Sequence, residues 1–297
     1  MLRLRNIIMI GILTMLSVFA NAQIDKVSAA ISLLQKGNLD SAKTIIDLAV
    51  ADTEIVNDGQ AWYIRGFIYK SIYNAREKTN IKSPLRLEAL NSFKRSLFID
   101  TSLANVVENK KNIKYLAATL YNDVKASLDS VNYLIAIDNF EKFKTYSKLI
   151  DTSQETIKQN DIKFLLALAS VYTQIYENDR KGKSEFLNLA KATYYKVLIL
   201  ESNNISANYN MGILFYNQAV QLINQSDYDI DIVALNDIQD NSVKLFKESL
   251  PFMEKAYQLD PKRREILLGL SGVHFSLNEK EKSDYYKQKL QELEKQK

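Results

Sequence analysis

Five apolar segments of this 297-residue chain each end in an acidic residue, and the acids recur at nearly even intervals. They are Asp52, Asp100, Asp151, Glu201 and Asp260, spaced by 48, 51, 50 and 59 residues. The segments carry apolar residues at i, i+3, i+4 and i+7, which is the period of an amphipathic helix. The polar residues or Pro after each acid can stop one helix and cap the next. The sequence therefore predicts a helical repeat.

Small side chains recur on the second helix of each predicted pair. Ala89 and Ser96 lie eleven and four residues before Asp100, and Ser249 and Ala256 have the same offsets from Asp260. Small residues on a helix face let a neighbouring helix approach to about 8–10 Å. Each unit is therefore predicted to be a close-packed pair of helices.

The first helix of each pair carries a small residue three positions before an aromatic one. The pairs are Gly66 with Tyr69, Ala118 with Tyr121, Ala169 with Tyr172, Gly212 with Phe215, and Gly272 with Phe275. Residues three apart share a face of a helix, so both members of each pair are expected to pack inside the repeat.

The composition supports an all-α fold. The chain has 8 Gly and 3 Pro, too few for the tight turns of a sheet with many hairpins. With 46% hydrophobic and 25% charged residues it can bury a sizeable core.

These patterns resemble the tetratricopeptide repeat family. One unit matches the family's pattern at Trp62, Gly66, Tyr69, Ala89, Phe93, Ser96 and Asp100. The resemblance implies an all-α, right-handed superhelix of about five antiparallel helix pairs over residues 23–297, with a terminal cap helix near 279–297. The family's repeat is about 34 residues long. The intervals here are longer, which favours unusually long helices joined by short turns. The match is poorest over residues 103–151, where Phe140 stands in place of Ala.

The first 22 residues have the layout of a secretory signal. Arg3 and Arg5 precede an apolar stretch from Ile7 to Phe19, and Ala20-Asn21-Ala22 forms a small-x-small cleavage site. The stretch of 13 residues is shorter than the roughly 20 that span a bilayer. We expect cleavage before Gln23 and a periplasmic or secreted protein, with an uncleaved anchor as the alternative. The last 90 or so residues also resemble exported repeat proteins of Gram-negative bacteria.

Several kinds of chemistry are excluded or disfavoured. The chain has no Cys, which rules out disulfides, a thiolate metal site, a Cys nucleophile and a lipoprotein anchor. Without Arg3 and Arg5 of the predicted signal, the net charge of +4 falls to about +2, which is too balanced for a nucleic-acid binder. His274 is the only histidine, and it is expected to be structural. Asp227, Asp229 and Asp231 alternate as in a calcium loop, but Gly at the sixth position and Glu at the twelfth are missing, so a linker is expected. No catalytic, cofactor or metal site is predicted.

The resemblance implies a scaffold that binds a protein or peptide on the inner face of the first helices. The candidate residues are Tyr63, Phe67, Lys70, Lys163, Ser170, Thr173, Tyr209, Ile213 and Tyr216. The alternatives are a groove that the protein fills with its own side chains, a self-assembling envelope spacer, and a hydrolase that uses a pair of carboxylates.

Overall fold

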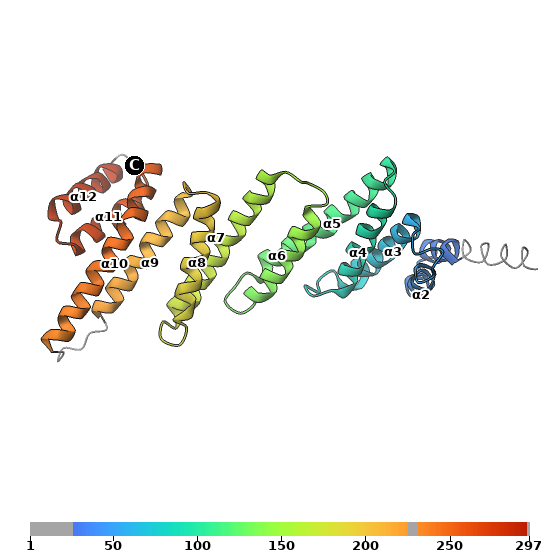
Figure 1. Ribbon diagram of the computed structural model, residues 1–297, viewed down its shortest axis with the longest axis horizontal. Coiled ribbons are helices and arrows are strands. Elements are labelled where there is room, and N and C mark those ends of the chain that lie inside the picture. Colours follow the sequence, from blue (N-terminus) through green and yellow to red (C-terminus); the bar gives the residue numbers. More distant parts are fainter. Residues whose placement is uncertain (1–25, 225–230, 296–297) are drawn as a thin grey trace, which may run out of the picture. The chain divides into compact units, whose positions relative to one another are not determined.

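The structure, a computed structural model, describes residues 26–224 and 231–295, and the regular elements of this part are all helical (Figure 1). Residues 26–35 are helical. They are followed by α2 (Leu39–Val50), α3 (Gly59–Ile72), the π-helical turn η1 (Tyr73–Glu77), α4 (Pro84–Ile99), α5 (Leu103–Ser127), α6 (Tyr133–Ser147), α7 (Gln154–Asn178), α8 (Glu185–Leu200), α9 (Ile205–Asn224), α10 (Ile232–Leu259), α11 (Arg264–Ser276) and α12 (Lys280–Lys295). The predicted all-α class is confirmed, and α12 stands where the cap helix was expected.

The chain divides into two compact units. Unit 1 holds the described residues up to Ser127 together with Leu134–Ser153, and unit 2 holds Leu128–Tyr133 and the described residues from Gln154 onward. In unit 1, α3 packs on α2 and α4, and α4 packs on α5. In unit 2, each helix from α7 to α12 packs on its neighbours in the chain. Packing between sequence neighbours is the mark of a helical repeat, so the predicted solenoid architecture is confirmed.

Three of the five recurring acids, Asp100, Glu201 and Asp260, cap the C-terminus of the second helix of a pair, as predicted, whereas Asp52 and Asp151 lie two and four residues beyond the ends of α2 and α6. Asp100 is the C-terminal capping residue of α4, and its backbone N–H donates to the Ser96 carbonyl at 2.9 Å. Asp260 takes the same place in α10 and donates to the Ala256 carbonyl at 2.9 Å. The two helices therefore end with the same hydrogen bond, although they belong to different units.

Two glycines show why small residues recur in the first helices. A Cβ atom at Gly66 of α3 would lie 2.8 Å from the ring of Phe93 in α4. A Cβ atom at Gly212 of α9 would lie 2.6 Å from Met253 in α10. Real Cβ atoms do not come that close, so only glycine lets these helices approach so far.

The extra length of the repeat lies in the helices. Both α5 and α7 have 25 residues, and α10 has 28. This confirms the expectation of long helices. The poorly matching segment pairs α5 with α6 through aromatic side chains: the rings of Tyr121 and Phe143 are 4.9 Å apart, and Phe140 is buried.

The predicted packing pair Gly272 and Phe275 is wrong by one residue. Phe275 is 69% exposed, whereas Ser271 and His274 are buried. His274 can take the inner place because its ring stacks on Tyr286 at 5.5 Å and its Nδ1 lies 2.6 Å from a Glu279 carboxylate oxygen. The expected structural role of His274 agrees with this packing.

The register of α5 is also shifted by one residue. Ala117 and Leu120 are buried, while Ala118 is exposed and Tyr121 is only partly buried. Two small residues stand side by side in this helix, and the aliphatic Leu120 fits the core where an aromatic residue was expected.

Several predicted features lie wholly or partly outside the residues that the structure describes. Residues 1–22, the predicted signal, lie outside the described residues, as do Asp227 and Asp229. Asp231 caps α10, where its carboxylate accepts the Ala234 backbone N–H at 2.8 Å. None of the helices described by the structure is both long and apolar enough to cross a membrane. The single repeat domain over residues 23–297 stays a prediction.

Candidate functional site

A groove of about 490 Å³ runs between α9 and α11 in unit 2. Both helices are first helices of their pairs. The groove is lined by Tyr209, Ile213, Tyr216 and Asn217 of α9, by Glu265, Leu268, Gly269, Ser271, Gly272 and Phe275 of α11, and by Lys287 of α12.

Each wall of the groove presents one stripe of a helix. On α9 the stripe is Tyr209, Ile213 and Tyr216, at i, i+4 and i+7. On α11, Leu268, Gly272 and Phe275 have the same spacing. Leu268 is 53% exposed and Phe275 is 69% exposed. Large apolar side chains exposed together in a concave surface are typical of a binding site.

Opposite charges stand at the two ends of the α11 wall. Glu265 lies in the first turn of α11, 3.4 Å from Arg263. Its own backbone N–H and Arg263 lower the pKa of the Glu265 carboxyl, so it is ionised at neutral pH. At the other end the Lys287 ammonium lies 5.4 Å from the centre of the Phe275 ring.

Contacts beneath the surface hold the groove side chains in place. The Tyr209 ring packs under Arg263, whose guanidinium carbon is 5.1 Å from the ring centre. Burial, and then the charge of Glu265, raises the pKa of the Tyr209 hydroxyl, which therefore keeps its proton. Tyr216 packs on Phe246 with 5.4 Å between ring centres. The walls are thus formed before any ligand binds.

No family model matches the chain. The sister chromatid cohesion protein PDS5 homolog of Dictyostelium discoideum is 33% identical over 135 residues. This similarity covers 43% of the chain but only 9% of the Dictyostelium protein. Such a short share of that protein transfers no function.

Similar solved structures include PilF of Pseudomonas aeruginosa and the TPR domain of P58(IPK). PilF is 13% identical, with 93% of this chain and 98% of PilF covered and a TM-score of 0.32. The P58(IPK) domain is also 13% identical, with 91% and 92% covered and a TM-score of 0.21. The helix pairs described above, with glycine at their closest approach, agree with the pattern read from the sequence. This chain resembles tetratricopeptide repeat proteins. Scores this low transfer no binding property.

Three of the predicted residues line the groove of this repeat protein, namely Tyr209, Ile213 and Tyr216. The facing residues Leu268 and Phe275 were missed. Their signal was a fixed offset from a small residue on the first helix: groove candidates lie six or three positions before it and one or four positions after it, as Tyr209, Ile213 and Tyr216 do around Gly212. Counted from Ser271 instead of Gly272, the rule gives Leu268, Gly272 and Phe275.

The predicted residues on α7 do not line this groove. Lys163 and Ser170 are exposed on that helix. Thr173 donates its hydroxyl proton to the Ala169 carbonyl at 2.9 Å. A binding role for these three residues stays a prediction.

The predicted residues on α3 are largely engaged with their own chain. The Tyr63 ring lies 5.8 Å from Phe93. The Lys70 ammonium donates to the Asn112 side chain at 2.7 Å and lies 5.4 Å from the Phe67 ring centre. Of these residues Phe67, at 37%, is the most exposed. Phe67 and Lys70 thus pack against the protein's own side chains, whereas Tyr63 also lines a separate cavity of about 270 Å³.

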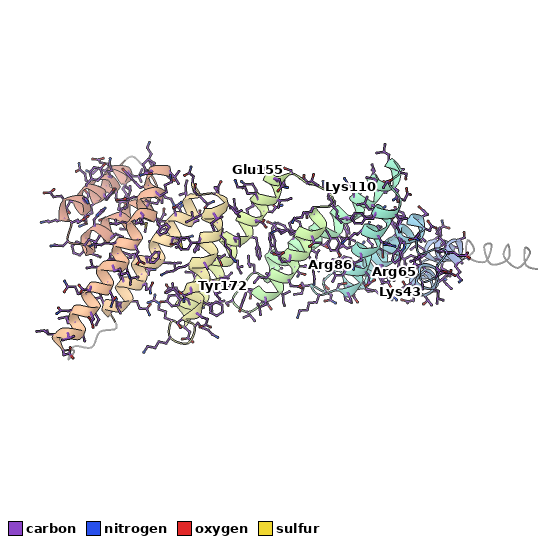
Figure 2. The ribbon with its side chains drawn as sticks, in the orientation of Figure 1. Lys43, Arg65, Arg86, Lys110, Glu155 and Tyr172 are labelled. Carbon is purple, nitrogen blue, oxygen red and sulfur yellow. The ribbon has the colours of Figure 1, made fainter. Side chains whose placement is uncertain are left out.

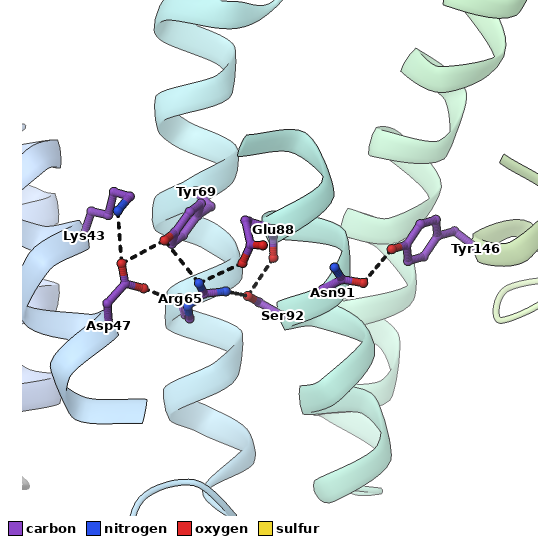
Figure 3. Close-up of polar contacts among 8 residues, drawn as sticks. All are labelled: Lys43, Asp47, Arg65, Tyr69, Glu88, Asn91, Ser92 and Tyr146. Carbon is purple, nitrogen blue, oxygen red and sulfur yellow. Dashed lines mark hydrogen bonds and ion pairs between the residues drawn. The ribbon is translucent and has the colours of Figure 1, made fainter. Parts of the chain in front are cut away.

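Unit 1 also contains a polar network across three helices (Figure 3). Its members are Lys43 and Asp47 of α2, Arg65 and Tyr69 of α3, and Glu88 and Ser92 of α4. The Arg65 guanidinium bonds to Asp47 and to Glu88, each at 2.8 Å. The Asp47 carboxylate also accepts a bond from Tyr69 at 2.8 Å. Because Arg65 pairs with both acids, the network joins α2, α3 and α4.

The residues that the structure describes contain no candidate metal site. Across residues 26–224 and 231–295, no three His, Asp or Glu side chains gather closely enough to hold a metal ion.

Proposed function

We propose that this protein is a scaffold that binds a protein partner in the groove between α9 and α11. The observation that carries the proposal is the pair of facing stripes, with Leu268 and Phe275 exposed on one wall. Burying those two side chains against a partner would remove apolar surface from water at roughly 25 cal/mol per Å². Their location in a preformed concave surface gives such a partner a defined place to bind.

We further propose that the scaffold works in the cell envelope and carries out no catalysis of its own. The signal-like layout of residues 1–22 supports export. The pairing of Asp47 and Glu88 with Arg65 supports a role without acid–base catalysis, because Arg65 already holds both carboxylates in ion pairs.

Crosslinking from the groove tests the proposal. A photoreactive benzoylphenylalanine replaces Leu268 in the full chain, which is expressed in the cells that make it and illuminated. We expect one crosslinked species of defined mass, which is lost when Tyr209→Ala is added. Leu235 on α10 is 48% exposed and does not line the groove, so the same label there is the matched control. Equal crosslinking from both positions, or none from Leu268, would reject the groove as a binding site.

A further inference from the structure

We propose that the occupant of the groove is an amphipathic α-helix of about three turns, which runs antiparallel to α11. This inference rests on the proposed function and adds the conformation, the direction and the charge pattern of the partner. The partner helix would carry apolar residues at i, i+4 and i+7, an acidic residue in its first turn and a basic residue in its last.

The two walls are built to receive a third helix. Each presents residues at i, i+4 and i+7, the spacing of a stripe on one helix face. Leu268 and Phe275 are seven positions apart, which is about 10.5 Å along the helix at 1.5 Å per residue. A partner helix with the same spacing places three apolar side chains along that length. Two facing stripes with a third helix between them complete a three-helix seam.

An extended peptide fits the groove less well because of its backbone. Its N–H and C=O groups would lie against apolar side chains such as Ile213, Leu268 and Phe275, and unpaired polar groups are costly where water is excluded. The groove offers few polar groups to pair with such a backbone. The Ser271 hydroxyl already lies 3.4 Å from that of Ser283, which leaves the amide of Asn217 and one hydroxyl each from Tyr209 and Tyr216. A helix satisfies its own backbone, so it needs no such partners in the groove.

The charges at the ends of the groove set the direction. A helix favours acidic residues in its first turn and basic residues in its last, because of its dipole. Lys287 stands at the Phe275 end of the groove and Glu265 at the start of α11. A partner helix places its acidic first turn beside Lys287 and its basic last turn beside Glu265 only when it runs antiparallel to α11. Both charges are exposed, and each already has a partner, Arg263 at 3.4 Å from Glu265 and Asp284 at 3.5 Å from Lys287, so they act mainly on direction.

Selection from a peptide library tests the conformation. A phage library of random 16-residue peptides is selected on the immobilised full chain. We expect the enriched peptides to repeat apolar residues at i, i+4 and i+7, to lack proline in the middle, and to bind Leu268→Asp at least tenfold more weakly. Leu235→Asp, the matched change outside the groove, should leave their affinity unchanged. Enriched peptides with proline or strict alternation that still need Leu268 would overturn the helix while leaving the groove intact.

A charge swap tests the direction. Each selected peptide is compared with a version in which its terminal acidic and basic residues are exchanged. On the wild-type chain we expect the acid-first version to bind about tenfold more tightly, and on Glu265→Lys with Lys287→Glu we expect the preference to reverse. Equal affinities on both proteins would overturn the antiparallel direction. If no enriched peptide depends on Leu268 and crosslinking from Leu268 also fails, the proposed function itself fails.

Discussion

Arg86, labelled in Figure 2, is a charged side chain of α4. It is only 1% exposed. Its guanidinium donates to Asp123 of α5 at 2.5 Å and to the Ile81 carbonyl at 3.0 Å. Removing one partner of a buried ion pair leaves an uncompensated charge. We therefore expect Asp123→Asn to lower the free energy of unfolding by about 3 kcal/mol. Urea unfolding followed by circular dichroism measures it. Asp138→Asn breaks an exposed pair with Lys142 and should cost under about 1 kcal/mol. Equal losses from both variants would contradict the role of burial.

Gly66 of α3 is also needed for packing, because the ring of Phe93 lies against it. A Cβ atom there would lie 2.8 Å from the ring of Phe93, which is fully buried and cannot move aside. We expect Gly66→Ala to lower the free energy of unfolding by about 1–3 kcal/mol, as overpacking does. At Gly272 a Cβ atom would meet the Tyr216 hydroxyl at 3.1 Å, so Gly272→Ala should cost less. Thermal unfolding compares the two, and a more stable Gly66→Ala protein would show that α3 and α4 can separate.

Single residues also show how far the sequence could predict this molecule. The small residues at the closest approaches between helices could be predicted from the sequence, because their spacing repeats along the chain. The choice between His274 and Phe275 was not, because the two are adjacent and both are compatible with a helix. It depends on Glu279, directly before α12, and on Tyr286 within α12, the helix that packs on α11. The groove wall formed by Leu268 and Phe275 was missed for the same reason.

At the scale of elements, the Glu279 carboxylate connects α11 and α12 by contacting His274 of α11 and Lys282 of α12. The ammonium of Lys282 and the ring of His274 lower the pKa of the Glu279 carboxyl below its reference of 4.5. A carboxyl whose pKa is lower in the folded state stabilises the protein above its unfolded pKa. That stability is lost as the pH falls through the folded value. We expect Glu279→Gln to lower the free energy of unfolding at pH 7, with a difference from wild type that shrinks below about pH 4.5. Chemical unfolding across pH 3–8 measures this, with Glu281→Gln as the control. A difference that does not change with pH would contradict the ionic contribution.

The arrangement of elements was predictable only in part. The helices themselves could be predicted from the period of the apolar residues and from the residues that end helices. Both signals depend only on residues close together in the sequence. The polar network was not predictable, because Asp47, Arg65 and Glu88 come from three helices and meet only after these have packed. Before packing, each of these charges looks like any other on a solvent-facing helix.

At the scale of the whole molecule, the predicted cleavage before Gln23 should leave the described fold complete. The first described helix begins at residue 26, and Ala30 within it is fully buried against α2. When the gene is expressed in a Gram-negative host, we expect the protein in the periplasm to begin at Gln23, as intact-mass measurement would show. Its thermal unfolding should match that of a chain produced from Gln23 onward.

Ile10→Arg breaks the apolar stretch that export requires and should keep the full-length protein in the cytoplasm. Thr14→Ser, a mild change in the same stretch, should leave export intact. Periplasmic protein that still begins at Met1 would instead favour the uncleaved anchor.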